Sequence, residues 1–230
     1  MKSNFHPTRW TLVQESRGND AIAKRALSEL CDIYYQPVRD FVFHQLPNKQ
    51  EADDLTHAFF EHLLENNSLQ NADETKGKFR TYLLGSVKHF IYRQLEKSNT
   101  QKRGGNATVL DIDDVQLPIN DHAAHQAFDR QWADAIIANA LTTLETQMKS
   151  QGKQNQFQLL QPWLDGGSTN STETTANNLG ISISATKVTI HRLRKRFRIL
   201  VRDEVTSTLP TGGNVTEELD HLIKVLSKPT

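Results

Sequence analysis

Apolar side chains recur every three or four residues along almost the whole of this 230-residue chain. Valine, isoleucine and threonine do not alternate with polar residues over any window as long as a strand, as they would in a half-buried β-strand. A helix that packs against a core buries a stripe of residues spaced at i, i+3, i+4 and i+7. The sequence therefore predicts an all-α protein.

The helical stripes fall into two groups separated by a connector of different composition. Residues 104–127 contain glycine, asparagine, proline and aspartate with little periodicity, which is typical of a linker. A chain of this length accommodates two domains of about 100 residues each. The predicted parts are an N-terminal extension helix in 1–20, a first helical domain in 21–103, an acidic linker in 104–127, a second helical domain in 128–209 and a C-terminal tail helix in 210–230.

Proline and periodicity set the expected helices of the first domain. Pro37 fits the first turn of a helix, so we expect a new helix to begin there. The stretch 51–65 should bury one face, and the stretch 78–97 another. The expected buried residues are Leu55, Phe59, His62 and Leu63 in the first stretch and Phe79, Leu83, Val87 and Phe90 in the second.

Cap and turn residues predict a helix-turn-helix in the second domain. Ser171 or Thr172 can cap a short helix, and Gly180 can adopt the positive φ of a tight turn. Ile181 is expected to plug the corner between the helices. The residues expected to cap the second helix are Ser182 or Ser184, and Thr216 ahead of two glutamates predicts the tail helix, Thr216 to Leu226.

Charge is segregated along the chain although the formal net charge is zero. Residues 50–75 hold seven acids and no lysine or arginine, whereas residues 76–103 hold eight basic residues and one acid. Residues 104–134 are acidic again, and residues 174–202 contain seven basic residues and no acid. Basic stripes are the electrostatic footprint of a phosphate-backbone partner. A single basic block is also typical of an ordinary solvated helix face. The presence of two such blocks is what favours a nucleic-acid partner.

The long helix of the predicted helix-turn-helix has two distinct stripes. Its buried stripe contains Ile190, Leu193, Phe197 and Leu200. Its outer stripe presents short side chains near the start and cations further along, which suits a helix lying in the major groove of DNA. The residues expected to bind DNA are Ser184, Lys187, Val188, His191, Arg192 and Lys195.

Several segments, in order along nearly the whole chain, resemble bacterial RNA polymerase sigma factors of the extracytoplasmic-function type, which belong to the sigma-70 superfamily. The core-polymerase-binding helix of that family is similar to EADDLTHAFFEHLLE (51–65), and its −10 segment is similar to GKFRTYLLGSVKHFIYRQLEK (77–97). Its −35 helix-turn-helix resembles TETTANNLGISISATKVTIHRLRKRFRILVRDEV (172–205). TRWTLV, QKRGG and FDRQW are similar to a subgroup with long linkers and a C-terminal tail. The resemblance implies a transcription initiation factor that is not an enzyme and needs no cofactor.

The resemblance also implies partners for the charged faces. The acidic face of 51–65 would dock on the basic coiled coil of the polymerase β′ subunit, and the β flap would be a further contact on core RNA polymerase. Cationic and aromatic groups of 77–97 would hold the melted −10 strand, and the second domain would bind the double-stranded −35 element. Phe79 matches an aromatic position of the family but fits the core better. The residues expected to bind core polymerase are Asp54, Ala58, Glu61 and Glu65, and those expected to bind −10 DNA are Lys78, Tyr82, Lys88, His89, Tyr92 and Arg93.

Three threonines depart from the family pattern. Thr175 and Thr186 stand where aliphatic residues are usual, and Thr189 stands where arginine is common. A buried threonine hydroxyl without a partner costs about 1–3 kcal/mol. We therefore expect each hydroxyl to bond the backbone carbonyl one turn back.

Other readings remain open at this point. A helix-turn-helix regulator that never engages polymerase would use the basic helix equally well, but it would not need the acidic face of 51–65. Acid and histidine three residues apart, as in Asp54 and His57, suit a di-iron bundle, but the rest of that ligand set is missing, so no metal is expected. Control by an anti-sigma factor and self-regulation by the tail 210–230 are both alternatives, as is simple packing of that tail.

Cysteine content and hydropathy indicate where the protein acts. Cys31 is the single cysteine, which excludes a disulfide within the chain and suits a reducing compartment. The sequence has no run of about 18 apolar residues, so we expect no membrane span. The expected location is the bacterial cytoplasm, in association with the nucleoid.

Overall fold

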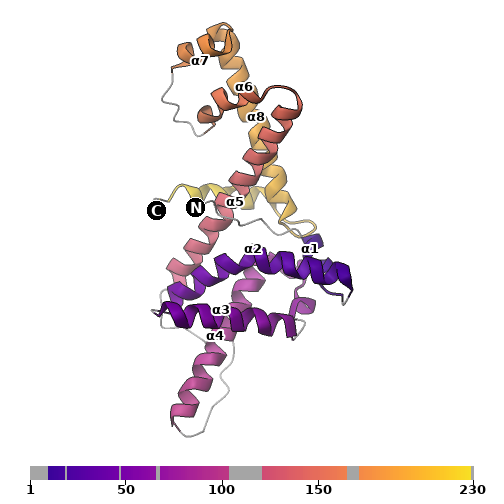
Figure 1. The fold of residues 1–230 in the computed structure, drawn as a ribbon, viewed down its shortest axis with the longest axis vertical. Coiled ribbons are helices and arrows are strands. Elements are labelled where there is room, and N and C mark those ends of the chain that lie inside the picture. Colours follow the sequence, from indigo (N-terminus) through magenta and orange to yellow (C-terminus); the bar gives the residue numbers. More distant parts are fainter. Residues whose placement is uncertain are drawn as a thin grey trace. The chain divides into compact units, whose positions relative to one another are not determined.

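The computed structural model describes residues 10–18, 20–46, 48–65, 68–103, 121–164 and 171–228. The described residues form helices and turns and contain no strand, which confirms the all-α prediction (Figure 1). None of the described helices combines the length and the apolar composition needed to cross a lipid bilayer. The α-helices are α1 (Trp10–Glu15), α2 (Ala21–Gln45), α3 (Lys49–Glu65), α4 (Phe79–Arg103), α5 (Asp121–Ser150), α6 (Gln154–Leu160), α7 (Thr172–Leu179), α8 (Ile183–Ser207) and α9 (Val215–Leu226).

The chain divides into two compact units whose bounds differ from the predicted domains. The first unit is residues 1–135 with 207–230, and the second is residues 136–206. Helix α5 therefore contributes its first half to one unit and its second half to the other. Of the predicted linker, residues 121–127 are helical and residues 104–120 lie outside the described residues. The tail helix α9 belongs to the first unit.

The core of the first unit lies between α2, α3 and α4. Phe59 of α3 meets Phe90 of α4 edge to face, with ring centroids 5.7 Å apart. Phe79 packs against Trp10 of α1 and Tyr34 of α2, at 5.9 and 5.4 Å. The four residues expected to line the buried face of 78–97 are all buried, so that prediction is confirmed: Phe79, Leu83, Val87 and Phe90.

Helix α2 runs without interruption through Pro37, so the prediction of a new helix at this residue is wrong. A proline inside a helix removes one backbone hydrogen bond and costs about 3 kcal/mol. Pro37 is nevertheless buried, together with Tyr34, Val38 and Phe41 on the same helix face. The free energy gained by burying this long apolar stripe of α2 exceeds the cost of the proline. A helix start predicted from one proline takes no account of that burial.

The buried face of α3 is rotated from the predicted one. Ala52, Thr56 and Phe60 are buried along with Phe59 and Leu63. Two residues of the predicted face are not: Leu55 is half-buried and His62 is exposed. The ring of His62 still lies 5.3 Å from that of Phe90, at the edge of the core. The small residues Ala52 and Thr56 let α3 approach its neighbours closely. A prediction based on large apolar residues alone overlooks these two.

The second unit has its own core, built from α5, α6 and α8. Its buried cluster draws residues from three helices, and partly buried aromatic and aliphatic residues pack around it. The short helix α7 packs beside α6. The buried cluster is Leu144, Met148, Phe157, Leu160, Ile190 and Leu193.

The turn between α7 and α8 follows from two caps and one glycine. Ser171 accepts a hydrogen bond from the N–H of Thr174 and caps α7, which confirms one of the two predicted caps. Gly180 lies at φ 66°, a left-handed conformation that favours glycine, and ends α7. Ser182 Oγ accepts from the N–H of Ala185 at 3.2 Å at the start of α8. At the other end of the chain Asn214, rather than Thr216, caps α9.

The prediction that Ile181 plugs the corner is wrong, because its side chain is 38% exposed. Its backbone N–H donates to the carbonyl of Ala176, which closes the helix end and holds the side chain outward. Ala176, Thr175 and Thr186 are the residues buried at this corner. Small side chains bring the two helices together, so no large plug is needed.

The buried threonines have the partners that were expected. Thr175 Oγ1 donates to the carbonyl of Ser171 at 3.1 Å, and Thr186 Oγ1 donates to that of Ser182 at 3.0 Å. Thr175 Oγ1 also accepts from the indole N–H of Trp163 at 3.3 Å. Only the first threonine therefore serves a second polar group.

This difference predicts unequal effects of the same substitution. Thr175→Val leaves the Trp163 N–H without its acceptor and should destabilise the second unit by about 1–2 kcal/mol. Thr186→Val removes the hydroxyl donor to the Ser182 carbonyl, but that carbonyl still accepts from the backbone N–H of residue 186. The loss in the free energy of unfolding should therefore stay below about 0.5 kcal/mol. Amide hydrogen exchange in α7 and α8 measures both. Equal losses in the two variants would contradict the assigned role of Trp163.

Candidate nucleic-acid interface

The outer face of α3 carries two acidic residues about two helical turns apart. Asp54 and Glu61 are exposed and lie seven residues, or about two turns, apart, so they share one side of the helix. Ala58 lies between them and is half-buried. We call these three residues the acidic face. The side chain of Glu65, the fourth residue predicted for this face, lies outside what the structure describes.

Two other polar side chains of α3, those of Asp53 and His57, are paired within the first unit. Asp53 forms an ion pair with Arg39 of α2, so its charge is already compensated. His57 Nε2 lies 2.8 Å from the hydroxyl of Tyr35, also on α2. Within the described residues no group of three or more histidine, cysteine, aspartate or glutamate side chains could hold a metal ion. The exposed acids of the described part of α3 are therefore Glu51 and the two carboxylates of the acidic face.

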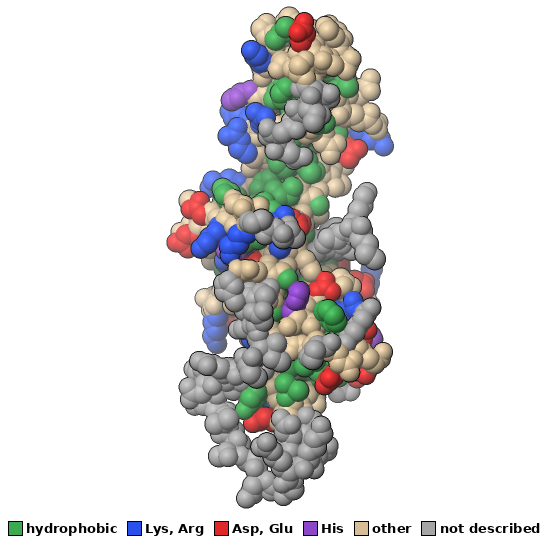
Figure 2. All heavy atoms as spheres, turned by 90° about the vertical axis from the view of Figure 1, so that its left-hand side faces the viewer, with side chains coloured by type: hydrophobic (Ala, Val, Ile, Leu, Met, Phe, Trp, Pro, Cys, Tyr) green, Lys and Arg blue, Asp and Glu red, His purple; other side chains and the backbone are tan. Residues whose placement is uncertain are grey.

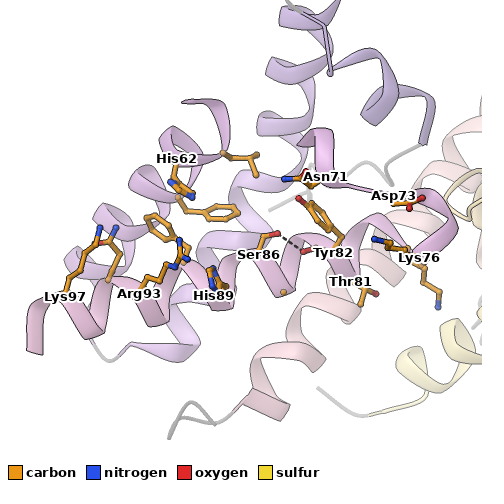
Figure 3. A pocket seen from close by; sticks show the side chains of 17 residues that line it. His62, Asn71, Asp73, Lys76, Thr81, Tyr82, Ser86, His89, Arg93 and Lys97 are labelled. Carbon is orange, nitrogen blue, oxygen red and sulfur yellow. Dashed lines mark hydrogen bonds between the residues drawn. The ribbon is translucent and has the colours of Figure 1, made fainter. Parts of the chain in front are cut away.

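An open pocket of about 580 Å³ lies on the first unit between α3, α4 and the segment that precedes α4 (Figure 3). Phe59, Leu63 and Phe90 provide apolar wall, and cations stand at several points of the rim. Figure 3 shows His62 near Arg93 and His89, and Tyr82 near Asn71. The polar and charged residues lining it are His62, Asn71, Asp73, Lys76, Lys78, Thr81, Tyr82, Ser86, His89, Arg93, Gln94 and Lys97.

The pocket brings together four of the six residues predicted to bind −10 DNA: Lys78, Tyr82, His89 and Arg93. The other two, Lys88 and Tyr92, do not line it. The hydroxyl of Tyr92 donates to Glu96 at 2.7 Å, and this hydrogen bond raises the pKa of Tyr92. The hydroxyl of Tyr92 thus bonds within α4 and does not face the pocket.

Sequence reasoning missed two cations of this pocket, Lys76 and Lys97. The signal for Lys97 was present, because it continues the i, i+4, i+8 row that begins with His89 and Arg93. Lys76 comes from the segment before α4, whose path no periodicity predicts. Both lysines add positive charge to the rim.

His89 contributes a neutral ring rather than a charge. Partial burial lowers its pKa, and repulsion from Arg93 and His62 lowers it further. At neutral pH the imidazole is therefore uncharged and can stack on a flat group or exchange hydrogen bonds. The cations of the pocket are the lysines and Arg93.

A buried carboxylate holds the basic residues at the start of α4. Glu218 of α9 is 1% exposed and forms ion pairs with Lys78 and with Arg80. Asp129 of α5 lies 3.7 Å from Arg80 Nε and 3.3 Å from His221 Nε2. The predicted DNA ligand Lys78 is thus neutralised by the tail helix.

The protonation state of Glu218 follows from opposing influences. Burial raises the pKa of Glu218, but attraction to Arg80 and hydrogen bonds from Arg80 and Lys78 outweigh burial and hold the pKa below its ordinary value. The ion pairs therefore stabilise the fold above the unfolded pKa of about 4.3, and that contribution is lost as the pH falls through the folded pKa. At neutral pH the carboxylate is ionised.

In the second unit, all six residues predicted to read the −35 element are exposed on α8. Val188 is 49% exposed and stands among polar neighbours. Figure 2 shows lysine and arginine side chains beside a histidine on the unit at the top of the view. The exposed residues are Ser184, Lys187, Val188, His191, Arg192 and Lys195.

The seven cations of 174–202 divide into two sets. Arg194 Nε donates to the carbonyl of Trp163 at 2.8 Å, and Arg196 Nε donates to Gln147 Oε1 at 2.9 Å. Arg198 Nε donates to the carbonyl of Arg194 at 3.3 Å. Within the described part of the chain the remaining four side chains make no hydrogen bond or ion pair and are exposed: Lys187, Arg192, Lys195 and Arg202.

Comparison with known proteins finds one family model that matches part of the first unit. Residues 30–101 match the family model for sigma-70 region 2. The matched segment includes most of α2, all of α3 and most of α4, and so covers both the acidic face and the pocket. No curated protein and no solved structure matches the chain.

Proposed function

We propose, from the match of residues 30–101 to sigma-70 region 2, that this chain is a sigma factor of the extracytoplasmic-function type that directs core RNA polymerase to promoters and opens the −10 element. One observation carries the proposal: a single region 2 segment presents an exposed acidic face on α3 and a cationic, aromatic pocket beside α4. A DNA-binding regulator that works without polymerase requires only a basic surface.

The acidic face supplies the docking surface. Asp54 and Glu61 are exposed, and complementary potential would steer them onto the basic β′ coiled coil of core polymerase. Ala58 between them lets the partner helix approach closely. The β flap and an anti-sigma factor are further candidate partners of the chain.

The pocket would hold bases of the melted −10 strand. Its volume of about 580 Å³ lies within the usual range for sites that bind a drug-sized group. Tyr82 and the neutral ring of His89 offer flat faces, and each base stacked on an aromatic side chain contributes about 1–3 kcal/mol. Lys76, Arg93 and Lys97 would contact the phosphates. Strand opening is then driven by capture of unstacked bases, with no bond made or broken.

The outer face of α8 would read the −35 element in the major groove. The short side chain of Ser184 and the apolar Val188 suit base edges and thymine methyl groups, and Lys187, Arg192 and Lys195 suit phosphates and guanines. Such a factor would act in the bacterial cytoplasm at the nucleoid. The acidic residues 104–127 would run toward the active-site channel of the polymerase.

Run-off transcription on genomic fragments tests this proposal. Core RNA polymerase of the host bacterium should start RNA chains at new, discrete positions when the protein is added, and the two should co-purify as a stable complex. Core enzyme alone provides the control. Identical start sites with and without the protein would overturn the proposal, and DNA binding without any complex with core enzyme would favour the regulator.

A further inference from the structure

We propose that Lys78 and Arg80 form a phosphate-binding site for promoter DNA and that Glu218 of the tail helix occupies this site in the DNA-free protein. The tail would therefore act as an internal competitor of DNA. This inference rests on the proposed function and concerns the regulation of the same surface. It also adds Arg80 to the residues predicted to contact DNA.

The geometry of Glu218 imitates that of a bound phosphate. Its Oε2 accepts from Lys78 and its Oε1 accepts from Arg80, so each oxygen meets a different cation. A phosphodiester has two such oxygens on one phosphorus atom. Arginine and lysine are the side chains that proteins most often use for this group.

Other contacts preorganise Arg80 for an anion. Its guanidinium lies over the ring of Trp132, 4.1 Å from the centroid, which fixes the plane of the fork. Asp129 Oδ1 lies 3.7 Å from its Nε. Only a cavity of about 10 Å³ lies beside Lys78, Arg80 and Trp132, and Glu218 itself is 1% exposed, so the site is closely packed.

The site adjoins the pocket assigned to the −10 strand. Lys78 lines that pocket, and Arg80 follows it by two residues at the start of α4. Of the pocket's other cations, Lys76, Arg93 and Lys97 form no ion pair within the described residues. DNA entering along α4 would thus meet the open cations Arg93 and Lys97 toward one end, and the occupied pair at the other end beside Lys76.

Exchange of the carboxylate for a phosphate is energetically feasible. Leaving one partner of a buried ion pair without a counter-charge is costly, whereas replacing one anion by another keeps both cations paired. The carboxylate and the phosphate would use the same two cations, and neither state leaves Arg80 unpaired. Strand contacts elsewhere in the pocket would raise the local concentration of phosphate and favour the exchange.

The decisive experiment compares Glu218→Gln with Glu217→Gln in the full chain. Both substitutions remove one negative charge from the first turn of α9, but Glu217 is exposed and forms no ion pair within the described residues. The probe is a fluorescently labelled 15-nucleotide single strand rich in A and T, titrated without polymerase. Glu218→Gln should bind it about 10-fold more tightly than wild type, and Glu217→Gln should stay within about 2-fold, because only the first frees cations for phosphate contacts.

The salt dependence gives a second readout. Freeing two cations should steepen the slope of log K against log salt by about 1.4, since each phosphate contact on a single strand contributes about 0.7. Adding Lys78→Gln to Glu218→Gln should remove much of the gain in affinity. A gain caused by loss of structure would persist in the double variant, so its reversal by Lys78→Gln shows that the freed cations bind the phosphates.

Two results would overturn the inference. Equal affinities of Glu218→Gln and Glu217→Gln would show that the tail does not compete with DNA. Weaker binding by Glu218→Gln, with a lower melting temperature, would show that Glu218 serves only to hold the fold together. Both results leave run-off transcription by the wild-type protein intact, whereas failure of the proposed function would appear in that transcription assay.

Discussion

Core RNA polymerase is expected to bind the double variant Asp54→Arg with Glu61→Arg about 100-fold more weakly than the wild-type protein. Both carboxylates are exposed on one side of α3, so the substitutions should leave the fold intact. Each introduced arginine would place a positive charge opposite the positively charged β′ coiled coil. Like charges at an interface cost several kcal/mol, and 1.4 kcal/mol corresponds to a factor of ten.

A matched control is available on the neighbouring helix. Glu29 and Asp32 of α2 are also exposed and also lie on one side of a helix, so Glu29→Arg with Asp32→Arg makes the same change in net charge. Affinity for core enzyme is measured by labelling the protein and titrating polymerase at fixed salt. Equal weakening by the two double variants would mean that general electrostatics, rather than the acidic face, governs assembly.

Lys187→Ala with Arg192→Ala should reduce promoter-specific transcription about 100-fold while leaving the affinity for core enzyme unchanged. Both cations are exposed on α8 and make no hydrogen bond or ion pair within the described residues, so they are available to DNA. A good bidentate contact to a base is worth about 1–3 kcal/mol, and phosphate contacts add further affinity. Run-off transcription from a mapped promoter measures the loss.

The control for this pair lies in the same unit. Lys149→Ala with Lys153→Ala removes the same charge from exposed positions at the end of α5 and just before α6, outside α8. Its transcription should fall by less than about 5-fold, since such charges act only through general attraction. If both pairs fall alike, or if the first pair also loses core binding, the assignment of the α8 face is wrong.

Local patterns predicted much of the fold. The all-α class, the buried stripe of α4, the Ser171 cap and the threonine hydrogen bonds follow from interactions between residues at most four apart, and the sequence displays these directly. The six exposed residues of the outer face of α8 could be predicted for the same reason. Helical spacing fixes which side chains share a face.

The failed predictions share a physical cause, which is competition between a local preference and tertiary packing. Pro37 favours a helix start, but the buried stripe of α2 keeps the helix continuous. Ile181 is apolar, yet closure of the α7 end holds it outward. The pairs of Glu218 with Lys78 and Arg80 join residues 140 and 138 positions apart, so no periodicity could reveal them.

The division of the α8 arginines separates two tasks within one helix. Arg196 anchors the helix to α5 and Arg194 anchors it to the segment after α6, while Lys187, Arg192 and Lys195 of the outward face are exposed and make no hydrogen bond or ion pair within the described residues. On the proposed function, exchange of the outward residues of α8 would change promoter preference without disturbing the packing that holds the helix in place. A family of factors with different regulons could share this scaffold and differ in a handful of surface positions.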